Sequence, residues 1–265
     1  MQTWPCAPTV AQAASTTTTT PSMSTAPSSH DVVPDEMRST WPHRALTLAG
    51  FLAILSSLLT TARLVTASAS PTADLLAAAI AAFAGYSLAD LATGVYHWLI
   101  DNYGGADTPV LGAQIAAFKD HHLRPSAIIL LEPCNNLHVA AGVVAVALPA
   151  AGAALSAGGG CGSPAAAHAF ASVLAACVML SVQFHAWAHE RPARLPPGVA
   201  ALQDAGVLLS PSQHAWHHRP PHDNTYCTVS GMWNGVLDGY KVFEAAEKVI
   251  YRATGVKPRS WVLKV

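Results

Sequence analysis

The chain has 265 residues, of which 51% are hydrophobic and only 11% are charged, whereas about 25% are charged in ordinary soluble domains. This shortage of charge predicts a membrane protein. The formal net charge is −1 and the sequence has no basic run, so it lacks the positive footprint of a nucleic-acid-binding protein. Its five cysteines are scattered and form no Cys-x-x-Cys pair, which disfavours a disulfide framework and a zinc ribbon.

Residues 1–40 are rich in Ser, Thr, Ala and Pro and contain no acidic residue before Asp31. Such a segment cannot bury a core. Two interpretations are open, a disordered tail and a cleaved organelle transit peptide, which is typically Ser-rich and poor in acidic residues. The lack of basic residues before Arg38 counts against the second, and the lack of an apolar h-region excludes a secretory signal peptide.

Residues 41–265 are expected to form the membrane domain, because they contain four apolar stretches long enough to cross a bilayer. At 1.5 Å per residue, roughly 20 helical residues span the ~30 Å hydrocarbon layer. We predict spans at about residues 45–67, 72–100, 137–155 and 165–187. Small residues fill these segments and permit close packing in lipid. The predicted fold is an all-α, multi-pass membrane helical bundle.

The second span carries three ionisable residues, Asp90, His97 and Asp101, at positions i, i+7 and i+11. This spacing places them on one helical stripe. Ionisable groups inside a span are costly and usually face a bundle interior or a functional site. A purely structural polar seam is the alternative, but His97 and Asp101 also have the spacing of metal ligands.

Further histidines lie in the polar connection at residues 102–136 and at the start of the third span. Adjacent imidazoles on a helix point about 100° apart, so His121 and His122 could serve two metals, or one could bind while the other donates a hydrogen bond. A surface histidine pair is the alternative. His138 fits a supporting or capping residue as well as a ligand, and His168, at the far end of the fourth span, is interpreted as a bystander.

Two tight histidine clusters follow. His185 and His189 are spaced i, i+4, and His214, His217 and His218 are spaced i, i+3 and i+4, so each cluster projects from one helix face. A lone buried histidine is often a satisfied core residue, but two clusters in one short stretch favour a metal site. Residues 196–209 between them predict a short helix lying along the membrane surface. After them we predict an extended segment at 224–230 and an amphipathic terminal helix at 241–254.

The candidate metal ligands are therefore His97, Asp101, His121, His122, His185, His189, His214, His217 and His218, with Asp90 and His138 as possible supporting residues. These are too many for one zinc ion, which takes three or four protein ligands, and the chain lacks His-Glu-x-x-His. Histidine and carboxylate with open coordination positions suit Fe(II) that activates oxygen, and two irons would use this number of ligands. Such a site at the edge of a membrane bundle predicts oxygen chemistry on a lipid.

Several motifs resemble a known family. They are Ala-Asp-Leu at 89–91, Gly-Val-Tyr-His-Trp at 94–98, Asp-Asn-Tyr-Gly at 101–104, His-His at 121–122, Asn-Asn-Leu-His at 135–138, Gln-Phe-His-Ala-Trp-Ala-His at 183–189 and Gln-His-Ala-Trp-His-His at 213–218. Through them, residues 80–261 resemble the Kua, or lipid desaturase domain, family. The resemblance implies a di-iron, oxygen-dependent desaturase in which the eight histidines and Asp101 hold the irons or support their ligands. Ordinary acyl-CoA desaturases have a second His-x-x-His-His where this chain has His121-His122, so the assignment of ligands to each iron stays open.

The chain resembles the plant plastid members of that family in particular. These place a trans double bond near the carboxyl end of palmitate in phosphatidylglycerol, whereas the animal members desaturate a plasmanyl ether lipid. The resemblance also implies the transit-peptide interpretation of residues 1–40, a chloroplast membrane location and plastid ferredoxin as electron donor. Two other classes stay open: a lipid hydroxylase with the same metals, and a non-enzymatic metal transporter or haem-binding membrane protein, whose histidines should line a path across the bilayer.

The order of the spans predicts one shared site. With short connections at 68–71 and 158–164 on one face, all nine candidate ligands fall on the other face. The lysines and arginines of the connections fall there too, namely Lys119, Arg124, Arg191, Arg194, Arg219 and Lys241. By the positive-inside rule this face is the cytoplasm-like side, which is the stroma in a plastid.

Overall fold

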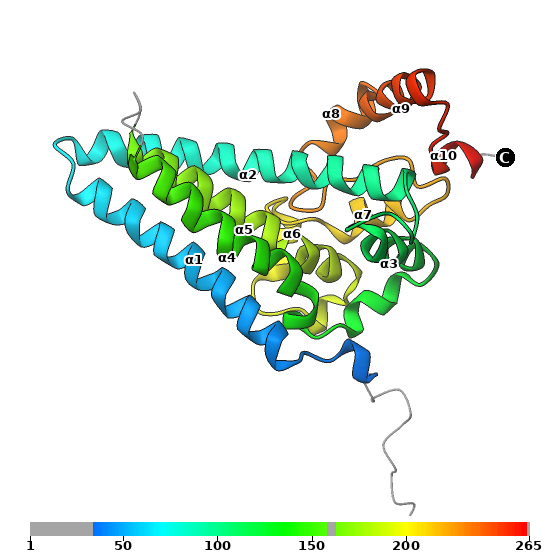
Figure 1. The fold of residues 1–265 in the computed structure, drawn as a ribbon, viewed down its shortest axis with the longest axis horizontal. Helices are drawn as coiled ribbons and strands as arrows, with labels where there is room; N and C mark the ends of the chain where they lie inside the picture. The colour runs from blue at the N-terminus through cyan, green and yellow to red at the C-terminus, as the bar shows by residue number, and fades with distance from the viewer. Residues whose placement is uncertain (1–33, 158–162, 264–265) are drawn as a thin grey trace, which may run out of the picture. The chain divides into compact units, whose positions relative to one another are not determined.

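The computed structural model describes residues 34–157 and 163–263, and all regular structure within these ranges is helical (Figure 1). The α-helices are α1 Trp41–Thr66, α2 Pro71–Asn102, α3 Gly112–Leu123, α4 Pro133–Ala157, α5 Pro164–His189, α6 Val199–Asp204, α7 Pro211–His217, α8 Asn234–Gly239, α9 Val242–Thr254 and α10 Arg259–Val262. Short 3-10 helices occupy Asp35–Met37, Pro125–Leu130 and Pro192–Arg194. The predicted all-α class is confirmed. The expectations for residues 1–33 and for the turn at 158–162 lie outside the described residues.

Four helices in the described part of the chain, α1, α2, α4 and α5, are long and apolar enough to cross a membrane. They correspond to the four predicted spans. Helices α2, α4 and α5 extend beyond both predicted ends, whereas α1 starts four residues earlier and ends one residue earlier than predicted. The extension matters most in α2, which continues to Asn102 and therefore holds Asp101 in its last turn. Pro71 and Pro164 stand at the first turns of α2 and α5, where a missing N–H costs no helical hydrogen bond.

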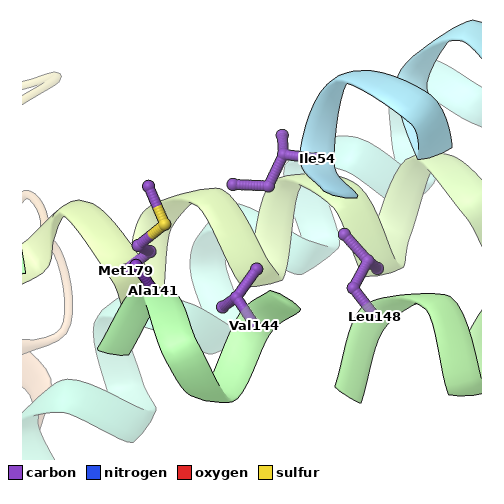
Figure 2. Packing of buried hydrophobic residues seen from close by; sticks show 5 residues of the cluster. All are labelled: Ile54, Ala141, Val144, Leu148 and Met179. Atoms are coloured by element: carbon purple, nitrogen blue, oxygen red, sulfur yellow. The ribbon is translucent and has the colours of Figure 1, made fainter. Parts of the chain in front are cut away.

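Helix α5 is the centre of the bundle, because it packs against α1, α2 and α4. One apolar cluster joins three of these helices: Ile54 of α1, Ala141, Val144 and Leu148 of α4, and Met179 of α5 (Figure 2). Glycine allows close approach on the other side of α5. A Cβ at Gly85 of α2 would lie 2.6 Å from the carbonyl oxygen of Phe170, so any side chain there would force the two helices apart.

The fold begins earlier than the boundary predicted at residue 41. The backbone N–H of Ser39 donates to Glu132 Oε2 at 2.8 Å, and Asn135 Nδ2 donates to the carbonyl oxygen of Glu36 at 2.9 Å. Residues 34–40, which the sequence assigned to the N-terminal tail, therefore belong to the ordered domain and hold the start of α1 beside the start of α4.

The C-terminal third of the chain is irregular and is fastened to α2. The predicted surface helix at 196–209 is shorter, with only Val199–Asp204 helical, while the predicted terminal helix is confirmed as α9. The segment predicted to be extended at 224–230 forms no strand ladder. Its backbone is held by side chains of α2 and α8. Thr93 Oγ1 of α2 accepts from the N–H of Thr228 at 3.2 Å, and the fully buried Asp90 of α2 accepts from that of Val229. Asn234 Oδ1 of α8 accepts from the N–H of Cys227 at 2.9 Å.

Candidate metal centre

All nine candidate ligands lie at one end of the bundle. His97 and Asp101 stand in the last turns of α2, and His185 and His189 in the last turns of α5. The short helices α3 and α7 lie beside these two helix ends (Figure 1) and deliver His121, His122, His214 and His217, with His218 directly after α7. The predicted convergence of helix ends on one face is what the structure shows.

Within the described part of the chain, the candidate ligands form two groups. In each group, the potential ligand atoms lie within 4.8 Å of one another. We call the first the five-histidine group; it consists of His121, His185, His189, His214 and His218. The second, the aspartate group, consists of His97, Asp101, His122 and His217. The neighbours His121 and His122 belong to different groups, which corresponds to the first of the two sequence alternatives for that pair.

The aspartate group is built around one carboxylate oxygen. Asp101 Oδ2 lies 3.3 Å from His97 Nε2, 3.5 Å from His122 Nε2 and 3.3 Å from His217 Nε2. His122 Nε2 and His217 Nε2 are also 3.0 Å apart. Four donor atoms from three helices thus point at one small volume.

The five-histidine group has a comparable arrangement without a carboxylate. His189 Nε2 lies 3.1 Å from His121 Nε2, and His218 Nε2 lies 3.0 Å from His214 Nε2. The ring of His185 completes the group at 4.3 Å from the ring of His214, measured between centroids. The two groups adjoin each other, since the His97 and His185 ring centroids are 5.6 Å apart.

Backbone carbonyls orient two imidazoles of the aspartate group. His97 Nδ1 lies 2.9 Å from the carbonyl oxygen of Tyr226, and His217 Nδ1 lies 2.9 Å from that of Asn224. A carbonyl can only accept, so each Nδ1 carries the proton and each Nε2 presents its lone pair to the group. This is the support that metal-bound histidines normally have.

His222 is part of the surroundings and was missed by the sequence reasoning. Its ring stacks on that of His122 at 4.3 Å with an interplanar angle of 15°, and its Nδ1 donates to the carbonyl oxygen of His217 at 2.9 Å. It stands alone in an irregular segment with a positive φ of 61°, so no helical spacing signalled it. The carbonyls of Asn224 and Tyr226 have no sequence signature at all.

Burial keeps the imidazoles in the neutral form that binds metals. It lowers the pKa of His121 and of His122 to about 3, and it lowers the pKa of His214 well below the ordinary value of a histidine. Neighbouring histidines lower all three further, while Asp101 partly offsets the shift for His122. These imidazoles are therefore neutral at neutral pH, each with one N–H group and one ring nitrogen whose lone pair can bind a metal.

The donor set fits metal ions. Several fully buried polar atoms of the two groups have no hydrogen-bond partner among the described residues: His97 Nε2, His185 Nε2 and both Asp101 carboxylate oxygens. Buried polar atoms are nearly always satisfied, and a buried carboxylate needs a positive partner. Two divalent transition-metal ions would satisfy the inward-facing donors and offset the charge of Asp101.

Three residues noted in the sequence lie away from both groups. Asp90 accepts from the backbone N–H groups of residues 229–231 and 233. The ring of His138 stacks on that of His43 at 4.0 Å, and its Nδ1 donates to the carbonyl oxygen of Asn135 at 2.7 Å. His168 is buried near the start of α5, where its Nδ1 lies 3.4 Å from Ser57 Oγ. The structure thus gives Asp90 and His138 contacts with backbone and α1 in place of the supporting contacts considered from sequence.

Comparison with known proteins identifies the family of this chain. The profile described as the lipid desaturase domain matches residues 86–261, which include all nine candidate ligands. The chain belongs to this family. It is 45% identical over 222 residues to fatty acid desaturase 4, chloroplastic, of Arabidopsis thaliana, a match that covers 84% of this chain and 65% of that relative.

Two further relatives indicate the breadth of the family. Fatty acid desaturase 4-like 2, chloroplastic, also of Arabidopsis thaliana, is 41% identical, with 85% of this chain and 77% of the relative covered. The plasmanylethanolamine desaturase of Myxococcus xanthus is 31% identical, with 66% and 61% covered. No solved structure gives a significant match.

Proposed function

We propose that the protein is an oxygen-dependent membrane lipid desaturase in which the five-histidine group and the aspartate group each hold one iron ion. Membership of the lipid desaturase domain family supports the activity. The observation that carries the di-iron assignment is the convergence of nine donors into two adjoining groups at one end of the spans. Histidine-rich donor sets with a carboxylate suit iron that activates oxygen.

The overall reaction removes two hydrogens from adjacent carbons of an acyl chain. One O₂ becomes two waters with two further electrons and two protons from outside. Two irons with oxygen supply the oxidising power for breaking an unactivated C–H bond, which no acid or base of the chain can provide. The protein's own residues hold and orient: Asp101 supplies negative charge, while His97 and His217 are fixed by backbone carbonyls. Burial of these three side chains keeps bulk water from the site.

We infer a palmitoyl chain of plastid phosphatidylglycerol as substrate and a trans double bond near its carboxyl end as product. The support is the motif resemblance to plastid family members together with the two chloroplastic relatives. Ends of spanning helices lie near the headgroups, so a site built there would meet the carboxyl end of an acyl chain before its methyl end. The plasmanylethanolamine desaturase relative supports an ether lipid as the second candidate substrate.

We further propose that the metal centre faces the chloroplast stroma and receives electrons from a ferredoxin-type donor. The support is the distribution of basic residues, because the connections on the metal-site face carry the lysines and arginines. A soluble donor on that side would approach the ends of α2 and α5, where the two groups lie.

Lipid profiling tests the proposal directly. The full chain is expressed with a ferredoxin donor in a photosynthetic host that lacks this activity, beside an Asp101→Asn variant as the inactive control. We expect palmitoyl phosphatidylglycerol to lose two hydrogens only with the unchanged chain. A product that gains oxygen would identify a hydroxylase, and a vinyl ether would identify an ether-lipid desaturase. An unchanged lipid profile with metal bound to the protein would contradict a desaturase.

A further inference from the structure

The last turn of α2 is held from outside by an arginine distant in sequence. A helix C-terminus leaves its final carbonyl groups without helical partners. The Arg259 guanidinium donates to four carbonyl oxygens there: to that of Gly104 at 2.6 Å, to that of Tyr103 at 3.1 Å, and in close contact to those of Ile100 and Asp101. The helix turn that presents the Asp101 carboxylate is therefore capped by a planar fork of N–H groups.

The next residue connects to the same turn by a different route. The backbone N–H of Ser260 donates to Asn102 Oδ1 at 3.1 Å, and Asn102 Nδ2 donates to the Tyr226 hydroxyl at 3.0 Å. The carbonyl oxygen of Tyr226 is the acceptor for His97 Nδ1. Three hydrogen bonds and two residues, Asn102 and Tyr226, thus separate α10 from His97, a candidate ligand of the aspartate group.

A buried glutamate on α9 completes the attachment. Glu247 is only 4% exposed; its Oε1 accepts from Trp98 Nε1 at 3.1 Å, and its Oε2 accepts from Trp261 Nε1 at 2.7 Å. Trp98 follows His97 directly in α2. We call Glu247, Arg259 and Ser260 the C-terminal clamp, because together they fix the side and the end of α2's last turn.

We propose that the C-terminal clamp positions the aspartate group and thereby controls the occupancy of one metal site of the two. This rests on the proposed two-metal centre. His97 and Asp101 are the two candidate ligands on α2, and both belong to the aspartate group. The members of the five-histidine group lie on α3, α5 and α7 and directly after α7. None of the clamp hydrogen bonds described above involves these elements. Arg259 is thus a positioning residue that acts through Asp101.

Metal titration of the full chain in detergent measures this selectivity. The protein is stripped with a chelator and titrated with cobalt(II) chloride, with absorption spectra reporting binding and elemental analysis counting the ions. We expect two ions for the unchanged chain. For Arg259→Gln we expect one ion bound as before and the other bound about 10- to 100-fold more weakly, the usual effect of losing a support of a ligand.

Three further variants sharpen the comparison. Arg259→Lys keeps the charge but loses the fork, so we expect a smaller weakening of the same ion. Glu247→Gln loosens the clamp without touching the carbonyls of α2, and it should weaken that ion too. If Arg259→Gln does not fold, Glu247→Gln still tests the effect of the clamp on that ion. Arg252→Gln, on the exposed side of α9, is the matched control and should bind both ions like the unchanged chain.

The outcomes separate the clamp from the metal centre itself. Unchanged binding of both ions by Arg259→Gln and Glu247→Gln would overturn the clamp and leave the two-metal proposal intact. Equal weakening of both ions would also overturn it, because that is what a general loss of structure produces. Fewer than two ions on the unchanged chain would contradict the two-metal centre, and the clamp with it.

Discussion

Asp90 provides a stringent test of how α2 is joined to the C-terminal segment. Its side chain is fully buried, and Oδ1 accepts from the backbone N–H groups of Val229, Ser230 and Gly231 at 3.1, 2.8 and 2.9 Å. Asp90 Oδ2 accepts from the backbone N–H of Trp233 at 3.2 Å. Replacing Asp90 by Asn keeps the shape, removes the charge and turns one acceptor into a donor.

The expected loss of stability follows from these four contacts. A hydrogen bond to a charged group contributes about 1.5–3 kcal/mol and one to a neutral group about 0.5–1.5 kcal/mol, so the three bonds to Oδ1 each weaken by roughly 1 kcal/mol. The N–H of Trp233 then faces an amide NH₂ and loses its acceptor, at a cost of about 1–3 kcal/mol. The lower cost of burying a neutral amide offsets part of this sum. We expect Asp90→Asn to lower the free energy of unfolding by about 3 kcal/mol.

Thermal unfolding in detergent is the assay. About 3 kcal/mol corresponds to a midpoint roughly 6–12 °C lower for a domain of this size. Asp204→Asn, an exposed aspartate on α6, is the matched control and should leave the midpoint unchanged. Metal content below the unfolding range should equal that of the unchanged chain. A midpoint like that of the control would refute the reasoning, and loss of metal at an unchanged midpoint would make Asp90 the support of the metal centre that the sequence suggested.

Three further outcomes are expected. Chelation should stop product formation and ferrous iron should restore it, whereas restoration by zinc alone would contradict an iron centre, since zinc has no redox chemistry. The His168→Ala variant should keep its metal content and its activity. Its free energy of unfolding should be about 1 kcal/mol lower, because the buried Ser57 hydroxyl loses a hydrogen-bond partner. Metal content and thermal unfolding measured on the same sample test both expectations. In sealed vesicles with Cys134 as the sole cysteine, an impermeant maleimide applied from the metal-site face should label this half-buried residue. Labelling only from the opposite face would refute the topology.

The spans and the clustering of the candidate ligands were predictable because both follow from spacing along single helices. Apolar stretches of sufficient length identified the four spans, and the i, i+3 and i+4 intervals of His185, His189, His214, His217 and His218 identified two faces that carry imidazoles. Counting spans then placed all candidates on one side. The pairing of His97 with His122 and His217 in one group was not predictable, because it depends on how α2, α3 and α7 approach one another.

Asp90 shows where a correct pattern led to an incomplete interpretation. Its position on the stripe of His97 and Asp101 predicted a polar environment, and the residue is indeed buried. The stripe could not distinguish a metal-supporting carboxylate from one that binds backbone amides, because amide donors are the same in every residue type except proline. Of the two alternatives, the structural polar seam describes Asp90, while His97 and Asp101 lie together in the aspartate group.

The C-terminal residues illustrate a limit that more careful sequence reading would not remove. Arg259 and Asp101 are 158 residues apart, and the groups that meet are a guanidinium and main-chain carbonyls. No spacing rule connects such partners, and an arginine near a chain end is ordinarily a solvated surface residue. Yet those carbonyls close the helix turn that carries the only carboxylate among the nine candidate ligands. We therefore expect substitutions far from every histidine motif to act on the proposed metal centre, and metal counting would detect them where motif inspection does not.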